Sequence, residues 1–186
     1  MAEPGAPMRL TGWGRVAPAT VAAYRPERQR EVGPIVAGAG DRGIIAHGAG
    51  RSYGDAALND GGEALLTGRL DRLISFDPAT GELVAEAGVT IDALLNVFLP
   101  RGWMPPVSPG TAYVTLGGAL ANDVHGKNHD RDGSFADHVR WFDLLTADGQ
   151  VLRIHPSDEL FAATAGGIGL TGIVLRLCFA PKKTPA

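Results

Sequence analysis

The stretch GAGRSYGDAALNDGG, residues 48–62, constrains the fold most, because it is rich in glycine and directly follows a short apolar strand. Glycine loses more backbone freedom on folding than any other residue, so such a loop needs a structural or functional reason. Consecutive N–H groups around glycines form a concave nest that binds anions. Arg51 adds a fixed positive charge, and Ser52 and Tyr53 add hydroxyl donors. The loop therefore predicts a phosphate site, with a plain surface turn as the alternative.

A Rossmann fold is excluded by spacing and context. Its dinucleotide-binding turn has the spacing G-x-G-x-x-G, after a strand and at the start of a helix. Gly48, Gly50 and Gly54 are one residue too widely spaced, and the segment after them is too short for the helix. Residues 167–172 have the right spacing but precede a strand, the reverse of the required order. The glycines of 164–172 still indicate that the backbone closely approaches something flat or bulky.

A second glycine-rich region, PGTAYVTLGGALANDVHG, covers residues 109–126. We expect Thr115 to cap a short helix there, because threonine oxygens accept amide N–H groups at helix starts. The first amides of that helix, those of Leu116, Gly117 and Gly118, would then be free to bind an anion. Both loops therefore predict anion sites formed by backbone N–H groups.

The segment HGKNHD, residues 125–130, carries the candidate chemical groups. His125 and His129 have a zinc-ligand spacing only if both lie on one helix face. Neighbouring glycines oppose such a helix and no cysteine pair completes a tetrahedral set, so we expect no metal site. Lys127 stands out because lysine otherwise occurs only near the carboxyl end of the sequence. The alternatives are a core histidine at 125 bonded to backbone and a solvated loop lysine at 127.

The order of expected elements indicates an α+β class with much antiparallel pairing. Hairpins are predicted where DPATGE separates RLISF from LVAEA, and where ADGQ turns the segment 138–156. Further strands are expected at 43–46 and 172–180. Helices are expected at 26–38 with a bend at Pro34, at 91–102 after the cap Thr90, and after the cap Ser157.

Composition excludes several classes of protein. A net charge of −3 over 186 residues, with no basic stripe, argues against nucleic-acid binding. No apolar run reaches the roughly 20 residues of a membrane span. The single cysteine, Cys178, rules out an internal disulfide and favours a reducing, cytoplasmic compartment. It lies in an apolar strand, where a thiol is usually inert, and no G-x-S-x-G nucleophile motif occurs. Residues 1–8 have the character of a loose leader without signal-peptide features.

Four motifs occur in order between Trp13 and Arg176: GAGRSYGD, PGTAYVTLGGALANDVHGKNHD, DLLTADG and TAGGIGLTGIV. Together they resemble the flavin-binding domain of the vanillyl-alcohol-oxidase/p-cresol-methylhydroxylase family, and the pair GRSYGD and HGKNH is similar to its sugar-lipid oxidases. The resemblance implies FAD extended between two small α+β subdomains, with mixed and antiparallel sheets and flanking helices. The subdomains would cover about 9–89 and 90–180, and 181–186 would be a tail or the start of a linker to a substrate domain.

The resemblance also implies which residues hold the cofactor. The first loop would wrap the pyrophosphate, the second would face it, residues 122–125 would run beside the flavin ring, and Ile173 or Val174 would contact the adenosine. The expected cofactor-binding residues are His47, Gly48, Ala49, Gly50, Arg51, Ser52, Tyr53, Gly54, Asp55, Ala56, Ala57, Gly110, Thr115, Leu116, Gly117, Gly118, Asn122, Asp123, Val124, His125, Ile173 and Val174. Relatives that attach FAD covalently often carry a histidine in the first loop, and the corresponding stretch here is Gly50–Tyr53. Non-covalent FAD is therefore expected.

The chemistry implied is oxidation of a sugar or sugar-lipid CH–OH group by hydride transfer to the flavin. His125, Lys127 and Tyr53 are the expected catalytic residues; the first two would position the substrate hydroxyl or stabilise developing negative charge. His47, Asn122 and Asp130 depart from the family pattern, which has arginine, a small residue or cysteine, and a second histidine at these places. The departure at Asp130 bears on the exact substrate.

The expected partners are a sugar or polyprenyl-phosphosugar substrate and an electron acceptor such as a reductase, a quinone or oxygen. No nucleic acid and no transmembrane segment are expected, and peripheral membrane association is compatible with the sequence. Three alternatives stay open: an aldonolactone or alditol oxidase, a non-catalytic flavin-binding module that needs a partner chain, and a phosphate-ligand domain without flavin.

Overall fold

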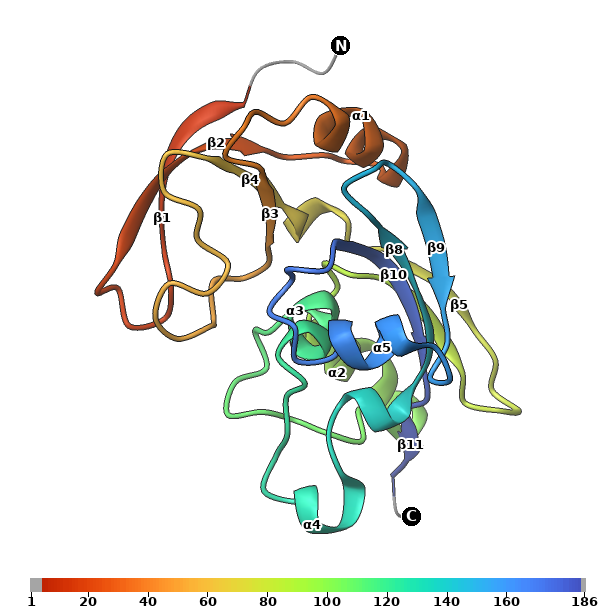
Figure 1. Ribbon diagram of the computed structural model, residues 1–186. Helices are drawn as coiled ribbons and strands as arrows, with labels where there is room; N and C mark the ends of the chain where they lie inside the picture. The colour runs from red at the N-terminus through yellow and green to blue at the C-terminus, as the bar shows by residue number, and fades with distance from the viewer. Residues whose placement is uncertain (1–4, 185–186) are drawn as a thin grey trace.

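The computed structural model describes residues 5–184, and its strands form two main sheets (Figure 1). The first sheet has the order β1-β2-β4-β3. β1 and β2 form an antiparallel hairpin, while β4 runs parallel to both β2 and β3. The members are β1 (Ala6–Thr11), β2 (Pro18–Tyr24), β3 (Ile44–His47) and β4 (Glu63–Leu66).

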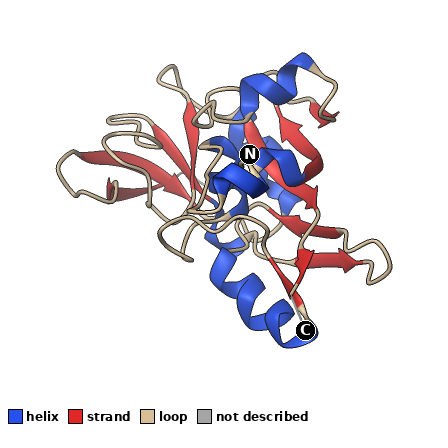
Figure 2. Ribbon diagram, turned by 90° about the horizontal axis from the view of Figure 1, so that it is seen from below, coloured by secondary structure: helices blue, strands red, loops and turns tan. Residues whose placement is uncertain are grey.

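The second sheet is antiparallel throughout, in the order β5-β6-β10-β8-β9. Its strands are β5 (Leu73–Phe76), β6 (Leu83–Glu86), β8 (Val139–Leu145), β9 (Val151–Ile154) and β10 (Ile173–Phe179). A short separate pair joins β7 (Trp103–Met104) to β11 (Lys182–Lys183). Figure 2 shows the two groups of strands on opposite sides of a central set of helices and loops.

The helices are short, and several are single 3₁₀ turns. In chain order they are η1 (Gln29–Glu31), α1 (Val32–Ala37), η2 (Thr67–Arg69), α2 (Ile91–Phe98), η3 (Leu99–Arg101), α3 (Leu116–Ala121), α4 (His129–Asp132), η4 (Ala136–His138) and α5 (Glu159–Thr164). In the described part of the chain, none is both long enough and apolar enough to cross a bilayer.

Two cores position the elements around the space between the sheets. The larger core packs α2, α3 and α5 onto the second sheet around the fully buried Phe135, Phe142 and Phe179. The smaller one joins the sheets, because Val32 and Ile35 of α1 pack with side chains of β4, β8 and β10. Burial of apolar surface on both sides of this junction holds the sheets in a defined relation.

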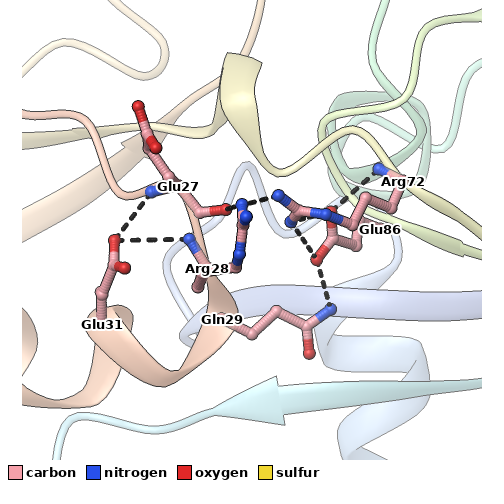
Figure 3. A network of polar contacts seen from close by, with 6 residues as sticks. All are labelled: Glu27, Arg28, Gln29, Glu31, Arg72 and Glu86. Atoms are coloured by element: carbon pink, nitrogen blue, oxygen red, sulfur yellow. Dashed lines mark hydrogen bonds and ion pairs between the residues drawn. The ribbon is translucent and has the colours of Figure 1, made fainter.

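A polar network reinforces the junction (Figure 3). The Glu86 carboxylate on β6 is 4% exposed and accepts hydrogen bonds from the Arg72 backbone N–H at 2.9 Å and from Gln29 Nε2 at 3.1 Å. The Arg72 guanidinium pairs with the same carboxylate at 3.2 Å and also donates to Glu27 O at 2.9 Å. The connection after β2, where Glu27 and Gln29 lie, is thereby tied to the second sheet.

The α+β class, the mixed and antiparallel sheets and both predicted hairpins are confirmed. Thr90 caps α2 as expected, since its Oγ1 accepts the Ala93 N–H at 3.1 Å. The cap of α5 is Asp158 and not Ser157, which was wrong by one residue. The helix expected over 26–38 is confined to η1 and α1, and Pro34 lies in the first turn, where a missing N–H is tolerated.

Three expected boundaries also change. Ala6–Met8 of the supposed leader pair with β2, while residues 1–4 lie outside the described residues. Lys182 and Lys183 of the supposed tail pair with β7, while residues 185–186 lie outside that range. The hairpin β5–β6 pairs with β10 in the second sheet, so strand pairing divides the chain near residue 70 and not at 89.

Candidate functional site

A cavity of about 820 Å³ opens between the two sheets. Three segments contribute much of its lining: the loop after β3, the loop that leads into α3, and the turn before β10. Its size falls within the roughly 300–1,000 Å³ range of small-molecule and cofactor sites. The cavity therefore gathers segments that are distant in sequence, and all three are glycine-rich.

The loop after β3 presents a run of backbone donors. Among the described residues, no acceptor is found for the amide N–H groups of residues 48–57. Gly50 and Gly54 have φ of +64° and +62°, a region that favours glycine. The buried His47 ring holds the loop from behind, because its Nδ1 donates to Ala57 O at 3.0 Å. An anion-binding nest is the arrangement that such a run of amides provides.

Arg51 links this loop to two aromatic side chains that also line the cavity. Its guanidinium carbon lies 5.4 Å from the ring centre of Trp13 and 5.9 Å from that of Tyr113, within reach of a cation–π contact. The Trp13 N–H donates to Ser52 O at 2.9 Å, which adds a backbone contact. We call Trp13, Arg51 and Tyr113 the aromatic clasp. It joins the turn between β1 and β2, the glycine loop and the loop before α3.

The start of α3 corrects one expectation. Thr115 caps the helix, since its Oγ1 accepts the Gly118 N–H at 3.1 Å, but the next amides are not free. Leu116 N–H donates to Val89 O at 2.7 Å and Gly117 N–H donates to Ala87 O at 2.8 Å. The expectation of free amides at 116–118 was wrong, because the segment after β6 supplies acceptors for the first two and the Thr115 cap accepts the third.

Gly117 has a packing reason for its small size. A Cβ there would lie 2.9 Å from the Ala87 Cβ and 3.2 Å from Ala87 O. Gly48 faces the same wall, where an added Cβ would lie 2.6 Å from Thr115 Oγ1. Glycine at both positions therefore lets the two loops approach each other closely.

The end of α3 and the turn before β10 are joined by backbone hydrogen bonds. Gly166 N–H donates to Leu120 O at 3.1 Å, and Ile168 N–H donates to Ala121 O at 2.8 Å. Asp123 has φ of +40°, and its Oδ1 accepts the Ala136 N–H at 3.0 Å. These contacts fix the backbone from 120 to 125 beside the cavity, where Asn122, Val124 and His125 line it.

The HGKNHD segment lies around α4, at the bottom of Figure 1. The His125 and His129 rings lie 5.8 Å apart, but only His129 belongs to the single helical turn. Asp132 at its end accepts from Asn128 and from Lys182 Nζ, and these bonds lower the pKa of its carboxyl. Between residues 5 and 184, no three histidine, cysteine or acidic side chains gather as a metal site. The exposed Lys127 does not line the cavity.

The cavity brings together most of the residues expected to bind the cofactor. Those that line it are Gly48, Ala49, Gly50, Arg51, Ser52, Tyr53, Ala57, Gly110, Thr115, Gly117, Gly118, Asn122, Val124, His125 and Val174. Those expected but outside its lining are His47, Gly54, Asp55, Ala56, Leu116, Asp123 and Ile173. His47, Leu116 and Ile173 are buried, so they support the lining from behind.

Other lining residues were not expected. They include Trp13, Ala46, Thr67, Ala87, Pro109, Thr111, Tyr113, Val114, Ala121, Ile168, Gly169 and Gly172. Several of these lie in stretches whose glycine content had already drawn attention, namely 109–126 and 164–172. No local pattern marks Trp13, Thr67 or Ala87, because strand pairing and loop packing bring them to the cavity.

Comparison with known proteins agrees with this geometry. A sequence profile of the family described as an FAD binding domain matches residues 20–155. Decaprenylphosphoryl-beta-D-ribose oxidase of Mycolicibacterium smegmatis is 49% identical over 177 residues, which cover 90% of this chain and 38% of that protein. Alditol oxidase of a Streptomyces species is 28% identical over 172 residues, which cover 90% of this chain and 40% of that protein.

A more distant relative is the mitochondrial D-2-hydroxyglutarate dehydrogenase of Bos taurus, 27% identical over 172 residues, which cover 83% of this chain and 31% of that protein. The chain thus spans less than half the length of these relatives. The resemblance expected from the four motifs, to a flavin-binding domain and to a decaprenylphosphoryl-ribose oxidase in particular, is confirmed.

Proposed function

Because this chain belongs to the FAD binding domain family, we propose that the cavity between its two sheets holds FAD and that the domain serves the oxidation of a sugar or sugar-lipid alcohol. FAD as the cofactor follows from the family. The observation that carries the placement is the run of amides at 48–53, which have no acceptor among the described residues and belong to residues that line the cavity. A diphosphate is the part of FAD that needs such donors.

The lining of the cavity fits the rest of the cofactor. Arg51 adds a positive charge beside the amide nest, and exposed rings of Trp13, Tyr53 and Tyr113 lie at the same opening. One part of the cavity wall is small and apolar, formed by Ala87, Gly117 and Val174. A flat heterocycle needs such a wall on one side and an aromatic or apolar partner on the other. The donor set and the shape are therefore both suited to a flavin dinucleotide.

We propose that three residues at or near the cavity, His125, Tyr53 and Lys127, contact the substrate. Bound FAD supplies the hydride acceptor. His125 is exposed and lines the cavity, so it is the candidate for positioning the substrate hydroxyl and holding its proton. Tyr53, 80% exposed at the cavity, is the candidate for a second hydrogen bond to substrate. Lys127 lies two residues after His125 in the sequence. A substrate that extends beyond the cavity would bring an oxyanion within reach of its ammonium group.

The substrate class is proposed from the relatives. The 49% identity to a decaprenylphosphoryl-ribose oxidase supports a polyprenyl-phosphosugar, and the 28% identity to an alditol oxidase keeps a free sugar alcohol as the second candidate. We also propose a reductase, a quinone or oxygen as electron acceptor, and peripheral membrane association for a lipid-linked substrate. A reducing, cytoplasmic location is proposed because the single cysteine, Cys178, is a buried free thiol.

FAD binding tests the placement directly. Titration of the purified chain with FAD should quench flavin fluorescence to saturation, and ADP should compete because it carries the diphosphate. Gly48→Ala should weaken binding at least about tenfold, because the new Cβ would collide with Thr115 Oγ1 at the junction of the two loops. Gly33→Ala is the matched control, since a Cβ there meets no atom within 4 Å. Equal FAD affinity in the wild type and Gly48→Ala, or no binding at all, would refute the placement.

Attachment and substrate need two further measurements. Acid precipitation should release all flavin into the supernatant, whereas colour in the pellet would show a covalent link. A chimera that joins this domain to the remaining length of the M. smegmatis relative should be bleached anaerobically by a polyprenyl-phosphoribose. Bleaching by alditols alone would favour the second substrate class.

A further inference from the structure

Ile168 has a backbone conformation that its residue type disfavours. Its φ is +56°, in the left-handed region, where a β-branched residue is a genuine outlier. Eleven glycines of the described chain also have positive φ, and two of them, Gly166 and Gly169, lie in the same turn. The strained position thus carries isoleucine in a turn otherwise rich in the residue that would relieve the strain.

The surroundings of the turn impose this conformation. Ile168 N–H donates to Ala121 O at 2.8 Å, Gly166 N–H to Leu120 O at 3.1 Å, and Leu170 N–H to Gly167 O at 3.0 Å. A Cβ at Gly167 would collide with Ala163 O, so α5 presses on the turn from the other side. Strained residues persist where surrounding structure over-determines them, and they concentrate at functional sites.

The place of Ile168 suggests why isoleucine is kept. It lines the cavity together with Ala121, Asn122 and Gly169, and it is 43% exposed. Of residues 167–169, only Ile168 has a side chain, and the neighbouring apolar Leu170, 80% exposed, does not line the cavity. An exposed branched side chain at a strained position contributes little to the core. It has the shape and polarity to pack on a flat ring.

We propose that the Ile168 side chain is a cofactor-contacting residue that packs against a flat heterocycle of bound FAD, and that this contact retains isoleucine in a left-handed conformation. The inference rests on the proposed placement of FAD in this cavity. Both the isoalloxazine and the adenine of FAD offer the required chemistry, a planar aromatic ring with an apolar face.

The experiment compares Ile168→Ala and Ile168→Gly, which both remove the side chain beyond Cβ and differ in the Cβ itself and in the backbone preference that it imposes. Both should bind FAD about three- to tenfold more weakly, the effect of losing a side chain whose exposed part is under half of its surface. Without FAD, Ile168→Gly should unfold about 1–4 °C above Ile168→Ala, because only glycine tolerates positive φ freely. At positions with negative φ, the alanine variant is normally more stable than the glycine variant.

Arg15 provides the matched control. It has φ of +54°, is exposed and does not line the cavity. Arg15→Gly should likewise unfold at a higher temperature than Arg15→Ala, but neither variant should change the affinity for FAD. Titration with riboflavin 5′-phosphate and with ADP identifies the ring: weaker binding of the first assigns the isoalloxazine, and weaker binding of the second assigns the adenine.

Several results would overturn the inference. Unchanged affinity for FAD in both Ile168 variants would show that the side chain makes no contact. A lower thermal unfolding midpoint for Ile168→Gly than for Ile168→Ala would show that the left-handed conformation at position 168 does not disfavour residues with a Cβ. Failure of the wild type to bind FAD would refute the proposed function as well, and so differs from failure of the Ile168 variants alone.

Discussion

The junction between the sheets yields a quantitative prediction for Arg72→Ala. Glu86 is 4% exposed and depends on three donors, the Arg72 backbone N–H, the Arg72 guanidinium and Gln29 Nε2. The substitution removes the guanidinium and its bond to Glu27 O, but leaves the other two donors to Glu86 in place. The loss is therefore one charge-assisted pair and one further hydrogen bond, and not the whole network (Figure 3).

The magnitude follows from these contacts. A hydrogen bond to a charged group contributes about 1.5–3 kcal/mol, and the lower half of that range applies because the Arg72 side chain is 41% exposed. We expect a loss of about 2 kcal/mol, which corresponds to a fall in the unfolding midpoint of about 4–8 °C for a chain of this size. Urea unfolding should give a lower midpoint concentration with an unchanged slope.

Two comparisons test whether the stability loss of Arg72→Ala comes from its contact with the buried Glu86 carboxylate. Arg140→Ala breaks a pair with Glu82 in which both side chains are about half exposed, at 3.8 Å, so it should cost under about 0.5 kcal/mol. In a Glu86→Gln background, Arg72→Ala should cost clearly less, since a neutral amide needs no counter-charge. The reasoning is refuted if Arg72→Ala costs no more than Arg140→Ala, or if its cost is the same in both backgrounds.

Three further predictions concern other parts of the molecule. Burial raises the pKa of Asp143, but hydrogen bonds from Arg153 and Arg176 outweigh it and hold that pKa below its ordinary 3.8. The stability from Asp143 is therefore fully present above its ordinary pKa and lost as pH falls through the lower folded pKa, so the difference in thermal unfolding between Asp143→Asn and wild type should be largest at pH 7 and shrink as pH falls through that folded pKa. Trp13→Leu should weaken FAD binding about two- to fivefold through loss of its contact with Arg51, and calorimetric titration should show a non-additive effect when combined with Arg51→Ala. In the chimera, Lys127→Ala should leave FAD affinity unchanged and lower turnover, and equal losses in both would make Lys127 structural.

Features that depend on a few neighbouring residues were predictable from sequence. The turn residues of DPATGE and ADGQ specify two hairpins, and Thr90 and Thr115 cap helices through their own oxygens. The cap of α5 was misplaced by one residue, because Ser157 and Asp158 are both good caps and only the three-dimensional path selects Asp158. Local chemistry thus predicts an element better than it predicts its first residue.

Features that depend on distant acceptors were not predictable. The amides of Leu116 and Gly117 have acceptors on Val89 and Ala87, which no pattern near residue 116 reveals. The hairpin β5–β6 lies in the second sheet because β10, far along the chain, pairs with β6. The aromatic clasp likewise needs three separate loops to meet.

The corrected amides change how the cavity is understood to bind its ligand. If both loops offered free N–H groups, a diphosphate would be held symmetrically, and either loop alone would retain some affinity. Instead the segment at 116–118 is a satisfied, rigid wall fixed to Val89 and Ala87, and of these two segments the first loop is the one whose N–H groups have no acceptor among the described residues. Affinity for the anion should then depend on the order of one loop, which His47 holds from behind and Arg51 holds at the front through the aromatic clasp. The wall at 116–118 therefore has no charge and no polar backbone group that still needs a partner. A planar ring can pack beside such a wall, and the apolar side chain of Ile168 can contact that ring.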